Sequence, residues 1–307
     1  MQLSNLRYVV AVVDAGTFTR AAADLGVAQP SLSQGIRALE AELGAELFHR
    51  TPAGAVLTPA GQALLAPARL ALHGAESARA AVAAVRGLDA GTLDLVVLPS
   101  LSVEPAVEMV GRFRRAHPGV MVRVREPIDV VAAAAAVREG TSEIALTELR
   151  SASPGLVEIV LGEQELVALV PRSGIPTGTG GGAGPISLER LAASPLIATP
   201  RGTSSRQQLE DSLAARGLSA DVAIETDHRE QIGPLVTAGA GCALVPLAVA
   251  ERLASPDVAV RRVRPRISRR IGLVHRDGPL TPAAAAFVAL ALGDPAPRAR
   301  RPRSRRR

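Results

Sequence analysis

The chain has 307 residues, 47% of them apolar and 21% charged, a composition that suits two or three globular cores and excludes a disordered chain. No basic leader precedes an apolar stretch and no apolar run is long enough to cross a bilayer, so we expect a cytoplasmic protein with no membrane role. The net charge is +6, but residues 298–307 contribute seven arginines and no acid, which leaves −1 for the rest and gives no general indication of nucleic-acid binding.

Three short helices are predicted at the N-terminal end. Apolar residues recur at spacings of three and four over residues 3–15, 17–24 and 29–43, and a glycine closely follows each stretch. Ser4 is positioned to cap the first helix and Thr17 the second, while Pro30 stands in the first turn of the third, where its missing N–H costs little. A short helix, a glycine turn and a further helix are the elements of a helix-turn-helix.

The third helix should carry a buried face and a polar face. On a helical wheel, an arc of about 60° collects its aliphatic side chains, Leu32, Ile36, Leu39 and Leu43. The neighbouring exposed arc collects a set suited to base edges and phosphates in a major groove, namely Gln29, Pro30, Ser33, Gln34 and Arg37. Any structural three-helix unit could show these stripes, so the pattern alone leaves open a role without DNA.

The sequence of this region closely resembles that of the LysR-type transcriptional regulators. The matching residues run from Phe18 to Gln34 and continue at 36–40, 43–44 and 47–50. The resemblance implies a winged helix-turn-helix domain over residues 1–58. The residues that it implies for binding double-stranded promoter DNA are Gln29, Pro30, Ser31, Ser33, Gln34 and Arg37, with Arg50 and Thr51 at a wing beside the phosphate backbone. Gly35 departs from the pattern and should cost the helix about 1 kcal/mol relative to alanine.

A long helix is predicted next, from a cap at Thr58 to about Arg86. Its apolar positions alternate spacings of four and three, which is a heptad seam: Leu64, Ala68, Ala71, Ala75, Ala78, Val82 and Val85. We therefore expect residues 59–88 to link two domains and to pair copies of the chain into a homodimer or homotetramer, and the resembling family has such a helix there. The alternative is an alanine-rich helix that packs on its own domain, and Pro67 should kink the seam.

From Gly91 the pattern changes to short apolar strands that alternate with helices. A first set of strands is expected over residues 93–98, 120–124, 144–147, 156–161 and 165–170, and a second set over 196–199, 222–225 and 242–245. The chain should then return through strands at 258–263 and 271–274. This order predicts two α/β lobes joined by two crossings, with lobe 1 at about 91–161 and 267–293 and lobe 2 at about 162–266.

The predicted fold is thus a multidomain α+β and α/β chain. It consists of a winged helix-turn-helix, a long linker helix and a C-terminal two-lobed α/β domain over residues 91–295. The resemblance implies that this domain is periplasmic-binding-protein-like, with a small-molecule effector held between the lobes. Residues 296–307 form an Arg-rich tail of disordered composition.

Hydroxyl-rich segments follow three of the expected strands, at residues 99–102, 147–148 and 199–205. Ligands collect at the carboxyl ends of strands in α/β sheets, where helix N-termini offer free N–H groups and a partial positive charge. Arg201 and Arg206 accompany the third segment, which favours an organic anion, although helix capping is the commonest use of such hydroxyls. By the resemblance, the effector-binding residues would be Ser100, Ser102, Thr147, Thr199 and Thr203, with Ile128 and Val245 as apolar walls. Leu101 and Arg201, which lie in the same segments, complete the predicted set.

Other functions find little support in the residues. The chain has no Gly-x-Ser-x-Gly elbow, no lysine for a phosphate-binding loop and no clustered histidines or cysteines, so we expect neither an enzyme nor a metal or other cofactor. The single cysteine, Cys242, lies in an apolar run and should pack in a core. The sequence predicts a DNA-binding transcription regulator that responds to a small molecule. The alternatives are a cytoplasmic small-molecule-binding α/β protein or an enzyme without a DNA role.

Overall fold

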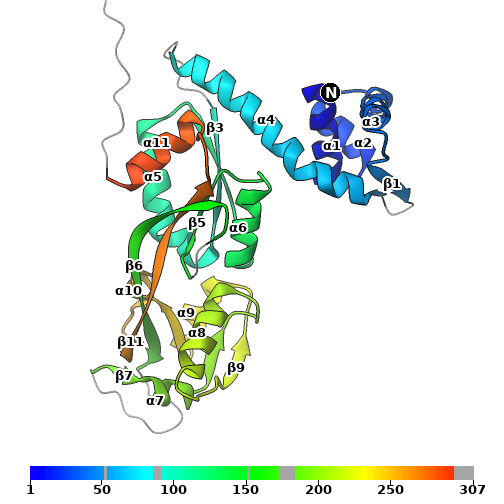
Figure 1. The fold of residues 1–307 in the computed structure, drawn as a ribbon. Helices are drawn as coiled ribbons and strands as arrows, with labels where there is room; N and C mark the ends of the chain where they lie inside the picture. The colour runs from blue at the N-terminus through cyan, green and yellow to red at the C-terminus, as the bar shows by residue number, and fades with distance from the viewer. Residues whose placement is uncertain (52–53, 86–90, 151–152, 173–183, 294–307) are drawn as a thin grey trace, which may run out of the picture.

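The computed structural model describes residues 1–51, 54–85, 91–150, 153–172 and 184–293. A small helical module at the N-terminus is followed by one long helix and by an elongated part that contains two α/β lobes (Figure 1). The two lobes, predicted from the alternation of strands and helices, are confirmed. In these ranges, no helix is both long enough and apolar enough to span a membrane. The predicted Arg-rich tail at 296–307 lies outside them.

The N-terminal module contains three helices and a hairpin: α1 (Leu3–Ala15), α2 (Phe18–Leu25), α3 (Gln29–Leu43), β1 (Phe48–Thr51) and β2 (Gly54–Leu57). The glycines that end the helices have left-handed backbones, with φ of 74°, 66° and 68° at Gly16, Gly26 and Gly44. Only glycine adopts this conformation without strain, which is why the sequence marks the helix ends. Thr17 caps α2 as predicted, whereas Ser4 does not cap α1, because that helix begins at Leu3 and Gln2 holds the cap position.

The core of this module forms where α1 packs against α2 and α3. Leu32, Ile36 and Leu39 are at most 2% exposed, as the helical wheel predicts. Leu43, the fourth member of that stripe, is 44% exposed, so the prediction is wrong at this residue. Gly35 has a packing reason, since a Cβ there would come within 2.7 Å of the Tyr8 ring. The glycine therefore lets α1 approach α3 closely and offsets part of its cost in helix propensity.

The long helix α4 (Pro59–Val85) begins as predicted, because the Thr58 hydroxyl accepts a hydrogen bond from the Gly61 N–H at 3.0 Å. Its helical backbone continues without a break through Pro67. The first half packs on its own module, where Ala68 is 1% exposed, so the alternative interpretation of the seam holds for this half. Further along, Ala71, Ala78 and Val82 are exposed.

Lobe 1 contains the parallel strands β3 (Gly91–Val97), β4 (Val120–Arg125) and β5 (Ile144–Glu148), with α5 (Val107–Ala116), α6 (Val130–Arg138) and α11 (Pro282–Ala291). Its main core centres on Phe113 and Phe287, whose rings pack edge to face at 5.5 Å. Two irregular helical turns, η1 (Pro99–Leu101) and η2 (Ser102–Ala106), follow β3. Lobe 1 also touches the linker helix, since a Cβ at Gly140 would come within 3.1 Å of Leu70.

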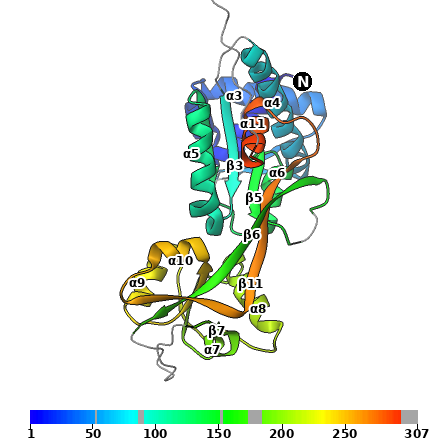
Figure 2. The same cartoon turned by 90° about the vertical axis from the view of Figure 1, so that its left-hand side faces the viewer.

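Two long strands join the lobes, β6 (Leu156–Pro171) and β11 (Val258–Arg276) (Figure 2). The sequence predicts four short strands here, and that prediction is wrong. The two strands pair antiparallel along most of their length, and the irregular stretches appear as register shifts after Arg262 and Ile271. Glycine and clustered polar residues suggest strand ends, but continuous hydrogen bonding to a neighbour carries each strand through them as bulges.

Lobe 2 is built from short elements: β7 (Ile186–Ser187), α7 (Leu188–Ala192), β8 (Leu196–Ala198), α8 (Ser204–Ala214), β9 (Val222–Glu225), η3 (Arg229–Gln231), α9 (Ile232–Thr237), β10 (Ala243–Pro246) and α10 (Leu247–Leu253). The order of strands in the main sheet is β10-β6-β11-β5-β3-β4, so one sheet runs through both lobes. Thr203, predicted to bind the effector, caps α8. Cys242 is 0% exposed in the lobe core, as predicted.

Candidate functional site

The exposed face of α3 is the first candidate site. Five of the six side chains proposed for it are exposed: Gln29, Pro30, Ser31, Gln34 and Arg37. Ser33 is only 5% exposed, and its hydroxyl accepts a hydrogen bond from the Gln29 side-chain amide at 2.9 Å. Ser33 is thus placed to orient Gln29 rather than to reach outward itself.

Arg37 is the only basic residue on that face, and it is available to an external anion. Within the described part of the chain it forms no ion pair and no side-chain hydrogen bond. An open hollow beside it is bordered by α2, by α3 and by β1, including Phe48 and His49. Arg50 and Thr51 lie on β1, but their side chains are outside what the structure describes. The α3 face and the hairpin therefore border one another, as a helix-turn-helix with a wing requires.

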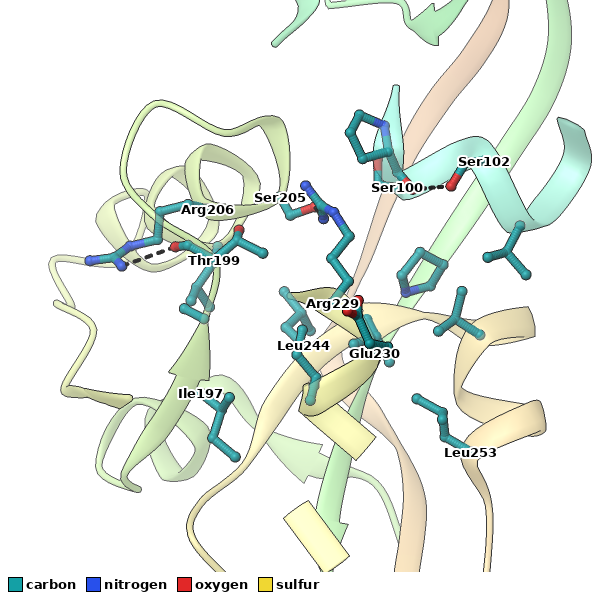
Figure 3. A pocket seen from close by; sticks show the side chains of 18 of the residues that line it. Ser100, Ser102, Ile197, Thr199, Ser205, Arg206, Arg229, Glu230, Leu244 and Leu253 are labelled. Carbon is teal, nitrogen blue, oxygen red and sulfur yellow. Dashed lines mark hydrogen bonds between the residues drawn. The ribbon is translucent and has the colours of Figure 1, made fainter. Parts of the chain in front are cut away.

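The second candidate site is a cavity of about 430 Å³ between the lobes (Figure 3). Lobe 1 contributes the η1 and η2 turns and Glu126, while lobe 2 contributes the ends of β8 and β10, the start of α8, η3 and α10. This volume falls in the range of small-molecule sites. Its larger aliphatic side chains are Val103 from lobe 1 and, from lobe 2, Ile197, Leu209, Ile232, Leu244, Val245, Val249 and Leu253.

The structure places four of the nine predicted effector residues along this cavity: Ser100, Ser102, Thr199 and Val245. Thr147, Leu101 and Thr203 do not line it, since Thr147 and Leu101 are buried in lobe 1 and Thr203 caps α8. Ile128 is 63% exposed and Arg201 has a side chain that is 81% exposed, and neither lines the cavity.

Arg229, a half-buried arginine in the lining of the cavity, was not predicted from the sequence. It follows strand β9, so the rule that ligands collect at carboxyl ends of strands would have found it had the rule been applied there. The cavity is also lined by apolar residues of α10 and by four exposed charged residues, Glu126, Asp227, Glu230 and Arg252. These come from separate segments that only the tertiary fold brings together.

Arg206, noted in the sequence beside Arg201, lies in the cavity wall but its charge is already balanced. Its side chain is 5% exposed and lies 2.8 Å from a Glu210 oxygen and 3.3 Å from a Glu225 oxygen. It also donates a hydrogen bond to the Thr199 carbonyl. Arg206 thus joins α8 to β8 and β9 and offers little charge to a ligand.

A chain of charged groups bridges the lobes next to the cavity. Arg150, after β5, lies 3.0 Å from a Glu148 oxygen in lobe 1 and 2.9 Å from an Asp211 oxygen on α8 in lobe 2. The second Glu148 oxygen lies 3.7 Å from Arg269, which also donates to the Gln164 side chain. Burial lowers the pKa of Arg269 to about 10, with repulsion from Arg150 and Arg229 adding to this and Glu148 opposing it.

Candidate metal ligands do not cluster in the part of the chain that the structure describes. No group of three histidine, cysteine, aspartate or glutamate side chains there could hold a metal ion. The buried charged residues Arg206, Glu148 and Arg269 each lie beside an opposite charge, so we interpret them as structural ion pairs within and between the lobes.

Comparisons with known proteins match both the N-terminal module and the two-lobed part of the chain. Residues 3–62 match the model of the bacterial regulatory helix-turn-helix proteins of the lysR family, and residues 86–294 match that of the LysR substrate binding domain. The HTH-type transcriptional regulator IlvR of Caulobacter vibrioides is 32% identical over 80% of this chain and 82% of its own. A Mycobacterium avium protein named "Probable hydrogen peroxide-inducible genes activator" is 30% identical over 89% of this chain and 88% of its own.

Solved structures agree with these matches. Full-length CbnR in complex with its target DNA shares the fold with a TM-score of 0.66 and 26% identity, over 95% of this chain and 99% of CbnR. The relatives are transcription regulators and not enzymes, which sets the enzyme alternative aside. With one family model matching residues 3–62 and another matching residues 86–294, this chain belongs to the LysR-type family of DNA-binding transcription regulators that carry an effector-binding domain.

Proposed function

We propose that this regulator acts in the cytoplasm, reads promoter DNA with the exposed face of α3 and responds to an organic anion held between its two lobes. The proposed domains are a winged helix-turn-helix at 1–58, a linker helix at 59–88 and an effector domain at 91–295. The observation that carries the DNA role is the polar face of α3, from Gln29 to Arg37, held from behind by buried aliphatic side chains. Arg50 and Thr51 of the hairpin are proposed to contact the phosphate backbone beside it.

The proposed assembly is a homodimer or homotetramer formed through α4 and the effector domains. Val82 is 63% exposed on the distal half of α4, and Ala71 and Ala78 on the same heptad seam are exposed too. Small residues along a seam allow two helices to approach closely. A pair of such chains would present two α3 helices to successive major grooves of one operator.

The Arg37→Ala variant tests the DNA role. It is expected to raise the Kd for the chain's own promoter fragment by about tenfold or more, because a guanidinium that contacts a base or a phosphate contributes about 1–3 kcal/mol. The measurement is an electrophoretic mobility shift at moderate salt, with random duplex as competitor. Arg112→Ala, an exposed arginine on α5 that forms no ion pair in the described chain, serves as the matched control and should leave the Kd unchanged.

Two outcomes would count against this proposal. An unchanged Kd for Arg37→Ala would remove that residue from the interface. A wild-type protein without preference for its own or any other promoter fragment over random duplex would remove the DNA role of the α3 face altogether.

One relative is named for hydrogen peroxide, but the thiol of this chain is unsuited to that chemistry. The thiolate is the reactive form of cysteine, and burial raises the pKa of Cys242 from its ordinary 9.0 to about 11. The side chain is also 0% exposed. We therefore propose that the effector is a bound molecule and that peroxide does not signal through Cys242.

Thiol labelling checks this proposal. At pH 8, native Cys242 should react with iodoacetamide at least about 100-fold more slowly than the urea-unfolded chain, since two pH units separate the two pKa values. The raised pKa in the fold also means that the contribution of the buried thiol to stability is complete below pH 9 and is lost as pH rises to about 11. Cys242→Ala should lack this part of the pH dependence. Equal labelling rates for native and unfolded protein would contradict the assignment.

A further inference from the structure

Arg229 has hydrogen-bonding capacity that the chain itself does not use. It is half-buried at the start of η3, and one Nη1 N–H donates to the Ser205 hydroxyl at 3.0 Å. Among the described residues, no carboxylate lies within ion-pair distance of it, in contrast to Arg206 and Arg269. A guanidinium has five N–H donors, so four remain for a ligand. Figure 3 shows this side chain reaching from η3 toward Ser205 and the turn that holds Ser100.

A second group beside Arg229 also lacks a partner. Ser100 is 9% exposed and lines the cavity, and its hydroxyl forms no hydrogen bond with the described chain. Leaving a buried hydroxyl unsatisfied is costly, so an acceptor in the cavity would be bound favourably. The start of α8, an eleven-residue helix, adds free N–H groups and a partial positive charge at the same place.

The charge balance at this end of the cavity is positive. Arg150, Arg229 and Arg269 lie close enough to influence one another. Glu148 is shared by Arg150 and Arg269, and Asp211 pairs with Arg150, which leaves Arg229 without an ion pair among the described residues. Glu126 faces Arg229 from lobe 1 but is exposed, so solvent screens it. A single anionic group would therefore find a partner here.

Among the described residues, the rest of the cavity offers no buried and unpaired partner for a second charge, because its other charged side chains are either paired or at the exposed rim. Figure 3 shows the tip of the Arg229 side chain between Ser205 and the turn with Ser100 and Ser102, while Ile197, Leu244 and Leu253 lie away from that tip. Arg206 is balanced by its own acids, and the charged residues Asp227, Glu230 and Arg252 are exposed. A second ligand charge inside would lie among aliphatic side chains, where an unpaired charge is strongly disfavoured.

We infer that the effector is a monocarboxylate with an uncharged, apolar body, and that Arg229 selects its carboxylate while β10, α9 and α10 receive the body. The inference rests on the proposed function, because it specifies the ligand of the same cavity. The carboxylate would accept hydrogen bonds from Arg229 and Ser100, and the apolar body would bury against Leu244, Val249 and Leu253.

Isothermal titration calorimetry on the full chain tests this with matched probes. The panel contains linear and branched monocarboxylates of four to eight carbons and benzoate, each with its own primary amide, together with leucine and adipate. At least one monocarboxylate should bind, and its amide should bind at least about tenfold more weakly. Leucine adds an ammonium group and adipate a second carboxylate, so both should also bind at least about tenfold more weakly.

Variants assign the selection to Arg229. Arg229→Gln should weaken monocarboxylate binding by about tenfold or more and should reduce the difference between acid and amide, while Arg229→Lys should retain part of that difference. Arg112→Gln, an exposed arginine on α5 that does not line the cavity, is the control and should bind like the wild type. Ser100→Ala gives a second test that does not remove a charge. It should also weaken binding of the monocarboxylate more than binding of its amide.

Each contrary result overturns the inference. Equal binding of acid and amide would do so, as would tighter binding of leucine or adipate than of every monocarboxylate. An Arg229→Gln variant that folds and keeps wild-type affinity would also overturn it. So would the absence of binding of any monocarboxylate at millimolar concentration. The same preparations are assayed by mobility shift on the promoter fragment. Retained promoter preference confines the failure to the ligand class, whereas loss of promoter preference in the wild type refutes the proposed function itself.

Discussion

Leu39→Ala is expected to lower the free energy of unfolding of the N-terminal module by about 2–5 kcal/mol and to abolish promoter binding. Leu39 is 0% exposed in the core where α3 packs on α1, so truncation leaves a cavity that the small module cannot fill. Because the module is small, such a loss is a large part of its total stability. Hydrogen exchange with mass spectrometry on peptides that cover α3 measures the loss, and the mobility shift measures binding.

Leu43→Ala supplies the control for this experiment. It makes the same chemical change on the same helix, four residues along, but Leu43 is 44% exposed. It should cost less than about 1 kcal/mol and leave promoter binding intact. Equal destabilisation by the two variants would show that Leu43 is buried in the protein as it exists in solution.

Glu148→Gln is expected to destabilise the effector domain by about 3–5 kcal/mol, because it leaves a buried arginine without its charge partner. The Glu148 and Arg269 side chains are 4% and 2% exposed. The substitution keeps the size of the side chain, so loss of charge is the main change. The chain has no tryptophan, so urea unfolding is followed by far-ultraviolet circular dichroism.

Two further variants identify the cause. Glu163→Gln makes the same change at an exposed position on β6 and should cost less than about 0.5 kcal/mol. Combining Glu148→Gln with Arg269→Met removes both charges and should restore at least about half of the lost stability. A double variant no more stable than Glu148→Gln would mean that the ion pair is not the origin of the effect.

The helix boundaries of the N-terminal module could be predicted because their signals are local. Each glycine stop needs a left-handed backbone, and the Thr17 and Thr58 caps satisfy N–H groups within three residues. The wheel could not separate Leu39 from Leu43, since both have the same periodicity. Leu43 is exposed because the end of α3 extends beyond the helices that pack against it, which depends on tertiary packing and not on sequence spacing.

The cavity was less predictable because its lining comes from distant segments. Ser100 and Thr199 were found because they follow strands recognisable by composition. Arg229 follows β9 and could have been found in the same way, whereas Leu253 could not, since α10 reaches the cavity only after lobe 2 has folded around β6 and β10. The same long-range pairing turned four expected strands into two, because hydrogen bonds from a neighbouring strand override local breaks.

The paired strands β6 and β11 decide how lobe 2 can move. Sliding one strand past the other would break their ladder of hydrogen bonds, whereas flexing or twisting the ribbon at its bulges keeps most of them. Closure of the lobes around a ligand is therefore expected to occur by bending of the paired strands β6 and β11, which act as an elastic hinge. Gly140 of lobe 1 packs against Leu70 of α4, so lobe 1 is the lobe in contact with the linker helix. The bend would therefore be transmitted to the DNA-binding module through lobe 1 and α4.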